Sequence, residues 1–218
     1  MDAFLSDIRL YGPGFALAAW TVFWLTILTI VVSWACGLAV ALAQRSRFPL
    51  VRGAARFYIW FIRGTPTLIQ VFIVYFSLPP FGIRLSPFTA GVLALGINSG
   101  AYVAEIIRGG LSAIPRGQME SALAMGFSPA ETMRGIILPQ VFRIILPSIT
   151  NEAISTLKNT SLLSTITVIE LTLYAQTLIA STFRPFEFYI AVALIYLALT
   201  TILSQLAAVL ERRYALAA

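Results

Sequence analysis

An uninterrupted run of uncharged residues, Leu10–Gln44, constrains this chain more than any other feature of its sequence. An α-helix rises about 1.5 Å per residue, so a helix of this length exceeds the roughly 30 Å hydrocarbon core of a bilayer. Charged residues make up only 11% of the chain, and mean hydropathy is +0.87. Soluble domains devote about a quarter of their residues to charge. The chain is therefore predicted to be a membrane protein.

Composition also excludes several function classes. The chain has no histidine and a single cysteine, Cys36, which excludes a Ser-His-Asp triad, a disulfide framework and the usual His- or Cys-based metal sites. A net charge of +6 would suggest nucleic acid as a partner of a soluble protein. Here the arginines flank apolar segments, as membrane topology requires, so no nucleic-acid partner is expected.

Five membrane-spanning helices are predicted, forming one all-α transmembrane domain over residues 1–218. The first is expected to tilt or to project beyond the bilayer because of its length. Leu171–Phe183 is apolar but too short to cross, which is typical of a re-entrant or interfacial segment. The predicted spans cover residues 15–43, 57–78, 85–104, 144–169 and 188–210.

The distribution of arginines predicts the orientation of the chain. Arginines concentrate in the loops after spans one and three and in the C-terminal tail, whereas the opposite side holds only Arg9, Arg84 and Arg184. Positively charged loops stay in the cytoplasm, so we expect the N-terminus outside and the C-terminus inside. The cytoplasmic arginines are Arg45, Arg47, Arg52, Arg56, Arg108, Arg116, Arg134, Arg143, Arg212 and Arg213.

The long cytoplasmic loop, about residues 108–143, carries the strongest local signals. Gly126 suits the left-handed position that ends a helix. Ser128 and Glu131 have the spacing of a capping box, with Pro129 at the first helical position. Two short helices meeting at Gly126 are therefore predicted. From the residues alone, this elbow is either a docking knob for a partner protein or an ordinary surface connection.

Resemblance to a known family favours the docking knob. The segment Glu120–Gly126, followed by Ile137-Leu138-Pro139, resembles the EAA loop of ABC importer permeases, with Ser121 in place of the first alanine. Other segments are similar to the permeases for polar amino acids, the branch that handles histidine, glutamine, glutamate, arginine and opines. These segments are Phe61–Thr67, Asn98–Arg108 and Lys158–Leu162, and the similarity extends from about Phe15 to the C-terminus.

The resemblance implies a type I ABC importer permease in a bacterial inner membrane. It implies a second permease subunit, identical or closely related, and an extracytoplasmic solute-binding protein that delivers a polar amino acid. It also implies ABC ATPase subunits docked at the elbow, where the coupling residues would be Glu120, Ala122, Gly126, Leu138 and Pro139. No cofactor is expected on this chain: its only lysine, Lys158, follows Ser-Thr-Leu and not a Gly-rich loop, so ATP is used by the partner.

Polar groups inside the spans are candidate pathway residues, because a charge at bilayer depth costs at least ~2.5–3.5 kcal/mol. Arg63 either extends to the cytoplasmic interface or lines the pathway. The next residues predict a broken helix, whose exposed backbone can bind a zwitterion. Asn98 either bonds a neighbouring helix or lines the pathway, and Glu105 can pair with Arg108. Gly96 and Gly100 form a GxxxG pair suited to close helix packing.

The fourth span adds a carboxylate and an ammonium group. An amino acid carries both charges, so Lys158 or Arg63 is expected to meet its carboxylate and Glu152 its ammonium. The alternative is a structural Glu–Lys or Asn-mediated network. The candidate pathway residues are Arg63, Gly64, Thr65, Pro66, Thr67, Asn98, Glu105, Asn151, Glu152, Lys158, Thr160 and Ser161.

Two rival functions remain at this point. Ser155 and Lys158 match the S-x-x-K spacing of some acyl enzymes, but the accompanying S-D-N and K-T-G motifs are absent. A gradient-driven channel or secondary transporter would need no docking elbow and would work without ATP. Five spans are few for a self-contained carrier with two repeats, so a dimer is expected in either case.

Overall fold

The computed structural model describes residues 2–214, together with the side chains of residue 7 and of residues 9–214. Within this part the chain is helical and has no strand. The elements are α1 (Asp2–Gln44), α2 (Pro49–Gly64), α3 (Thr67–Phe76), η1 (Pro79–Phe81), α4 (Pro87–Ala113), α5 (Arg116–Ala124), α6 (Pro129–Thr132), the π-helical η2 (Met133–Ile137), α7 (Leu138–Asn159), the 3₁₀-helical η3 (Thr160–Ile166), α8 (Leu171–Thr182) and α9 (Pro185–Tyr214).

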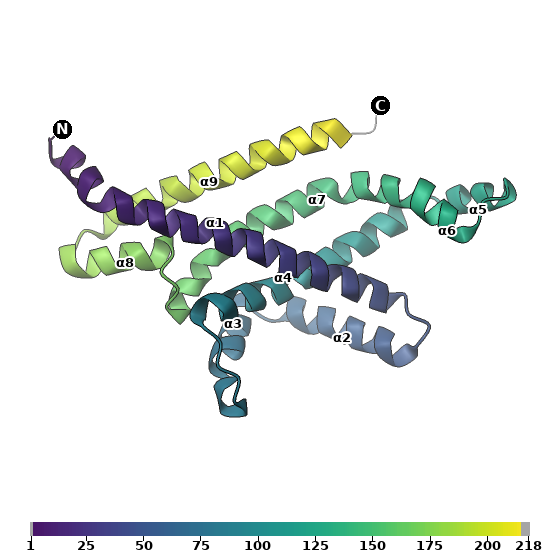
Figure 1. Ribbon diagram of the computed structural model, residues 1–218, viewed down its shortest axis with the longest axis horizontal. Coiled ribbons are helices and arrows are strands. Elements are labelled where there is room, and N and C mark those ends of the chain that lie inside the picture. The colour runs from purple at the N-terminus through teal and green to yellow at the C-terminus, as the bar shows by residue number, and fades with distance from the viewer. Residues whose placement is uncertain (1, 215–218) are drawn as a thin grey trace.

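Helix α1 packs along α4 and also contacts α7, α2 and α8 (Figure 1). Its close approach to α4 depends on glycine: a Cβ at Gly96 would lie 2.5 Å from Val32 Cγ1, and one at Gly100 would lie 2.8 Å from Cys36 Cβ. Both distances are shorter than van der Waals contact, so only glycine permits this packing. The GxxxG pair thus packs two helices of the same chain closely together.

Helices α2 and α3 are separated by a sharp bend of 110° at Thr65-Pro66. Proline lacks a backbone N–H and clashes with the preceding turn, so a helix cannot continue through it. The expected break is therefore present, and residues 57–78 do not form one straight helix. The hairpin of α3 and η1 projects sideways from the long axis of the bundle (Figure 1).

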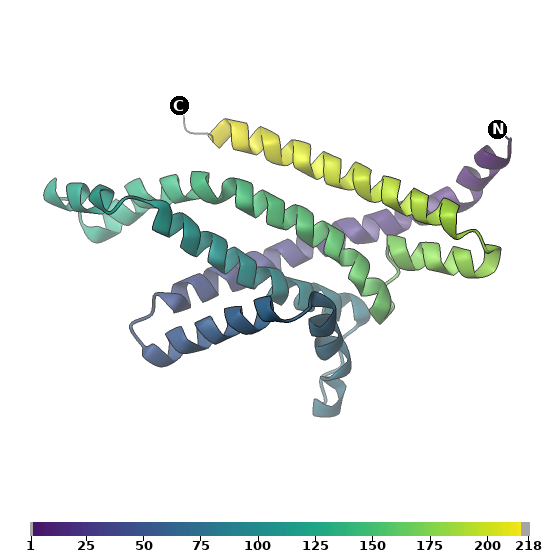
Figure 2. The same ribbon diagram turned by 180° about the vertical axis from the view of Figure 1, so that it is seen from behind.

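The molecule is elongated, and different helices lie at its two ends. Helices α5 and α6 and the loop between α1 and α2 lie at one end, whereas the N-terminal part of α1 and helix α8 lie at the other (Figure 2). At this second end Arg184 donates to the Asp7 carboxylate over 2.8 Å and joins α1 to the start of α9.

Three helices are long and apolar enough to cross a bilayer: Arg9–Gln44 within α1, α4 and α9. Two bent pairs bring the number of candidates to as many as five, if α2 with α3 and η1 forms one span and α6–η3 with α8 forms another. The second pair bends by 46°. The predicted short segment Leu171–Phe183 corresponds to α8, which is a helix that follows this bend.

Candidate functional site

The elbow between α4 and α7 consists of the short helices α5 and α6, with a cap at the end of the first and another at the start of the second. At the end of α5, Gly126 has φ +88°, and its N–H donates to the Leu123 carbonyl while that of Phe127 donates to the Ala122 carbonyl. These two bonds form a Schellman motif. The predicted left-handed glycine is confirmed, and its physical reason is that a Cβ is disfavoured at this φ.

The predicted capping box begins α6 directly afterwards. Ser128 Oγ accepts a bond from the Glu131 N–H, and the Glu131 carboxylate accepts bonds of 2.8 Å and 2.7 Å from the Ser128 N–H and hydroxyl. The Ser128 hydroxyl, followed by its backbone N–H, lowers the pKa of Glu131 below its ordinary value. Ionised Glu131 therefore stabilises the start of α6 fully above the ordinary pKa of glutamate. This stabilisation is lost when the pH falls through the lowered pKa of Glu131.

The tip of the elbow exposes apolar side chains that the sequence reading missed. Leu123, Met125 and Phe127 are 43%, 69% and 46% exposed. The predicted coupling residues differ in how exposed they are. Glu120, Gly126, Leu138 and Pro139 are exposed and accessible to a partner, whereas Ala122 is buried and packs inside the elbow.

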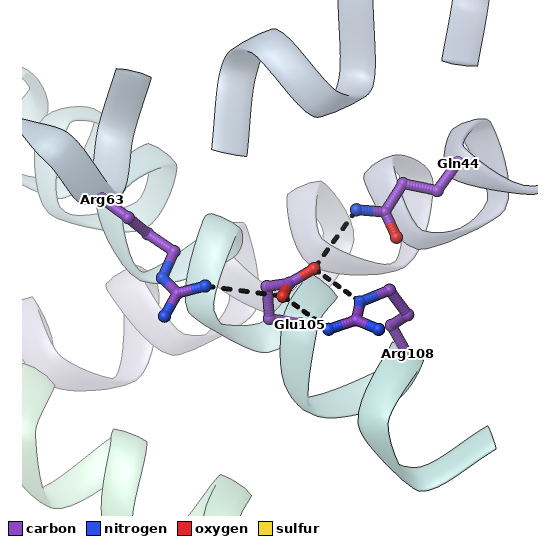
Figure 3. A network of polar contacts seen from close by, with 4 residues as sticks. All are labelled: Gln44, Arg63, Glu105 and Arg108. Carbon is purple, nitrogen blue, oxygen red and sulfur yellow. Dashed lines mark hydrogen bonds and ion pairs between the residues drawn. The ribbon is translucent and has the colours of Figure 1, made fainter. Parts of the chain in front are cut away.

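Glu105 of α4 bonds side chains of two other helices, α1 and α2 (Figure 3). Its carboxylate accepts two bonds of 2.9 Å from Arg108 of the same helix, one of 3.4 Å from Arg63 of α2 and one of 3.3 Å from Gln44 of α1. The Arg63 guanidinium also lies over the Tyr102 ring, 5.7 Å from its centroid. Arg63 is thus partnered within the protein, and the expected pairing of Glu105 with Arg108 is confirmed.

At the break between α2 and α3, the buried Gln70 side chain bonds a backbone carbonyl that the break leaves without a backbone donor. Pro66 cannot donate to the Ile62 carbonyl four residues before it, and Gln70 Nε2 donates to that oxygen over 2.8 Å. The same amide lies 2.7 Å from Thr65 Oγ1, and Asn98 of α4 donates to Gln70 Oε1 over 3.0 Å. Of the two roles left open for Asn98, the structure therefore shows the interhelical bond.

Glu152 belongs to a buried hydroxyl network between α1, α4 and α7. Ser33 donates to Ser99 over 2.9 Å, Thr156 donates to Ser99 over 3.3 Å, and Ser99 donates to the Glu152 carboxylate over 2.7 Å. In the part of the chain that the structure describes, Glu152 and Lys158 form no ion pair. Glu152 is held by the Ser99 hydroxyl instead, so the structural network around it is made by hydroxyl groups and not by a Glu–Lys pair.

Lys158 lines an open cavity of about 440 Å³ between α7 and α9. The facing wall of α9 is mixed, with Thr200, Thr201, Ser204 and Gln205 beside Leu197 and Ala208. Asn151 is exposed as well. Thr160 is buried and donates to the Leu157 carbonyl, and Ser161 donates to the Lys158 carbonyl. The Thr160 hydroxyl also lies 3.3 Å from the Tyr196 hydroxyl of α9, whereas Lys158 and Asn151 are accessible.

The remaining pathway candidates lie at the helix break itself. Gly64 ends α2, Thr65 follows it in an extended conformation and donates to the Phe61 carbonyl over 2.9 Å, and Thr67 begins α3. The freed Ile62 carbonyl, which was expected to be available to a zwitterion, is already bonded to Gln70.

One buried acid was missed by the sequence reading. Glu170 is fully buried, caps the start of α8 through the Thr172 and Leu173 N–H groups, and accepts a bond of 3.0 Å from the Tyr196 hydroxyl of α9. An acid directly before an apolar helix is an N-cap signal that could have found it. Its bond to Tyr196 is not visible in the sequence.

Known proteins are similar to this chain over most of its length. The model of the family described as "Binding-protein-dependent transport system inner membrane component" matches residues 33–216. The glutamine transport system permease protein GlnP of Escherichia coli K12 is 42% identical over 192 residues, which cover 87% of this chain and 88% of the relative. The octopine transport system permease protein OccM of Rhizobium meliloti is 41% identical, with coverages of 86% and 80%.

Solved structures agree at the level of the fold. An amino acid ABC transporter crystallised with histidines has a TM-score of 0.90, 41% identity and coverage of 96% of this chain and 98% of its own. The inward-facing MetNI methionine ABC transporter has a TM-score of 0.75 at 16% identity, with 93% and 96% covered, and shares the fold. With its helical bundle and its capped elbow, this chain belongs to the family of binding-protein-dependent transport system inner membrane components.

Proposed function

We propose that this chain is the permease subunit of an ABC importer for polar amino acids and that it is driven by separate ATPase subunits through the elbow. The single observation that carries the proposal is the exposed apolar tip Leu123, Met125 and Phe127, held on a turn whose two ends are capped. Exposed apolar groups gathered among polar residues mark a protein interaction site. Membership of a transporter family makes the ATPase the fitting partner.

The membrane arrangement is part of the same proposal. The chain crosses the membrane five times, with the N-terminus outside and the arginine-rich elbow side in the cytoplasm. Two permease subunits, identical or closely related, enclose the pathway. An extracytoplasmic binding protein delivers the solute to the end that holds α8. The even distribution of exposed apolar side chains along α9 supports a surface that meets lipid or a second subunit.

The proposed solute is an amino acid, by analogy with the relatives named for glutamine and octopine transport. No described basic side chain pairs with the Glu152 carboxyl group, and Lys158 lines an open cavity. The two groups match the ammonium and the carboxylate of such a solute. The other pathway candidates keep this role as a proposal.

Coupling is tested in proteoliposomes that contain the permease, its ATPase and its binding protein. Glu120→Lys and Gly126→Val should abolish ATP-driven uptake while leaving membrane insertion intact. Valine is strained at φ +88°, although nothing lies within 4 Å of its Cβ, whereas asparagine tolerates the left-handed region. Gly126→Asn is therefore the matched control and should keep uptake. Normal coupling in the valine variant would contradict the proposed contact.

Two further measurements examine the solute and the rival function. Glu152→Gln and Lys158→Met should each lower the apparent solute affinity at unchanged ATPase docking, and unchanged uptake in both would remove these residues from the pathway. Vesicles that contain the permease alone should show no solute flux. Flux without the ATPase would instead favour a gradient-driven channel or carrier.

A further inference from the structure

A cavity at the elbow end of the bundle is separate from the one that Lys158 lines between α7 and α9, and it shares only Glu105 with the candidate pathway residues. It measures about 450 Å³ and opens between the end of α1, the middle of α2 and the last turns of α4. Its lining residues are Gln44, Arg45, Arg56, Ile59, Trp60, Glu105 and Arg108. Three arginines against one glutamate give the cavity an excess of positive charge.

Two of these arginines are available to a ligand. The Glu105 carboxylate holds Arg108 in a two-bond ion pair. Among the described residues, Arg45 and Arg56 have no ion-pair partner, and both are exposed. The Gln44 amide donates to Glu105, which leaves its Oε1 buried without a hydrogen-bond donor in the described part of the chain. The cavity thus offers two free cations and one unsatisfied acceptor.

The outer rim of the cavity is apolar and aromatic. Trp60 is 70% exposed, and Phe57, one turn before it, is 62% exposed, with the two ring centroids 5.7 Å apart. Tryptophan gathers where the hydrocarbon core of a bilayer meets the headgroups. Arg45 directly follows the long uncharged run of α1, so the cations lie at the same boundary.

We propose that this cavity binds an anionic phospholipid. The phosphate lies between Arg45 and Arg56, a headgroup hydroxyl donates to Gln44 Oε1, and an acyl chain covers Phe57 and Trp60. Basic pockets between membrane helices suit anionic headgroups. A free phosphate ion would satisfy the cations but would leave the aromatic rim bare, which favours the lipid. The inference rests on the proposed function only for the presence of the chain in a membrane.

The test is native mass spectrometry of the full chain in neutral detergent, titrated with phosphatidylglycerol or with phosphatidylcholine. The wild type should bind phosphatidylglycerol at least tenfold more tightly. Each arginine near a membrane surface contributes roughly fivefold, so R45Q/R56Q should weaken phosphatidylglycerol binding about twenty-five-fold. R45K/R56K keeps both charges and should retain most of the binding. R47Q/R213Q removes the same charge outside the cavity and serves as the matched control.

Several results would overturn the lipid site. An equal loss in R47Q/R213Q would mean that net charge, not the cavity, attracts the lipid. Displacement of bound phosphatidylglycerol by millimolar inorganic phosphate would make this a phosphate site. Equal affinity for both lipids would remove the role of the arginines. None of these readouts involves uptake, so failure of the lipid site and failure of the proposed transport function are observed separately.

Discussion

At the scale of single residues, Gln70 shows how a membrane protein can tolerate a broken helix. A backbone carbonyl without a partner is costly inside a bilayer, and Pro66 leaves the Ile62 carbonyl in that state. The Gln70 amide replaces the missing backbone donor, and Asn98 holds the amide in place from α4. Pro66, which removes a backbone donor, and Gln70, which replaces it, therefore act together.

Replacement of Gln70 by leucine should accordingly destabilise the fold. Gln70→Leu leaves the buried Ile62 carbonyl and the Asn98 amide without their partners, and each unsatisfied buried group costs about 1–3 kcal/mol. Thermal unfolding of the purified chain in detergent measures the loss. Gln176 is exposed, so Gln176→Leu is the control and should change the melting temperature little. Equal melting temperatures for the two variants would show that the Gln70 hydrogen bonds contribute nothing to stability.

At the scale of elements, the contact between α1 and α4 depends on the absence of two side chains. A methyl group at position 100 would meet Cys36 Cβ, whereas one at Gly109, farther along the same helix, would meet nothing within 4 Å. Overpacking costs typically about 1–3 kcal/mol. Gly100→Ala should therefore lower the thermal stability, and Gly109→Ala should leave it unchanged or raise it slightly, because alanine favours helix. A stable Gly100→Ala variant would mean that α1 and α4 separate easily.

The elbow is the second element with a distinct prediction. Burying a phenylalanine side chain contributes about 1.5–3 kcal/mol, so Phe127→Ala should weaken ATPase binding roughly ten- to hundredfold. Retention of the ATPase during purification and a binding isotherm measure the effect. Phe186 is 76% exposed at the other end of the molecule, and Phe186→Ala should bind the ATPase normally. Undiminished binding by Phe127→Ala would place the contact elsewhere.

At the scale of the whole molecule, the two ends of the bundle should face different compartments. With Cys36 replaced by serine, a single cysteine at position 125 or 183 reports its own side, since both native side chains are exposed. A membrane-impermeant maleimide should label position 183 in intact cells with a permeabilised outer envelope. It should label position 125 only after the inner membrane is opened. The reverse pattern would invert the proposed orientation.

The sequence by itself determined the features that depend on neighbouring residues or on local chemistry. The uncharged run Leu10–Gln44 determined the membrane class, Pro66 determined the helix break, and Gly126 with the Ser128–Glu131 pair determined the elbow. In each case the interacting groups lie within a few residues, so their spacing contains the geometry. The family resemblance then added the transporter class, which the comparisons confirm.

Only the tertiary structure decided which polar groups meet. Glu105 bonds Gln44 across 61 positions, Ser99 bonds Glu152 across 53, and Glu170 bonds Tyr196 across 26. Helical periodicity predicts the face on which a side chain lies but not which helix covers that face. Whether a charged side chain is neutralised, as at Arg63, or lines an open cavity, as at Lys158, therefore depends on how the helices pack.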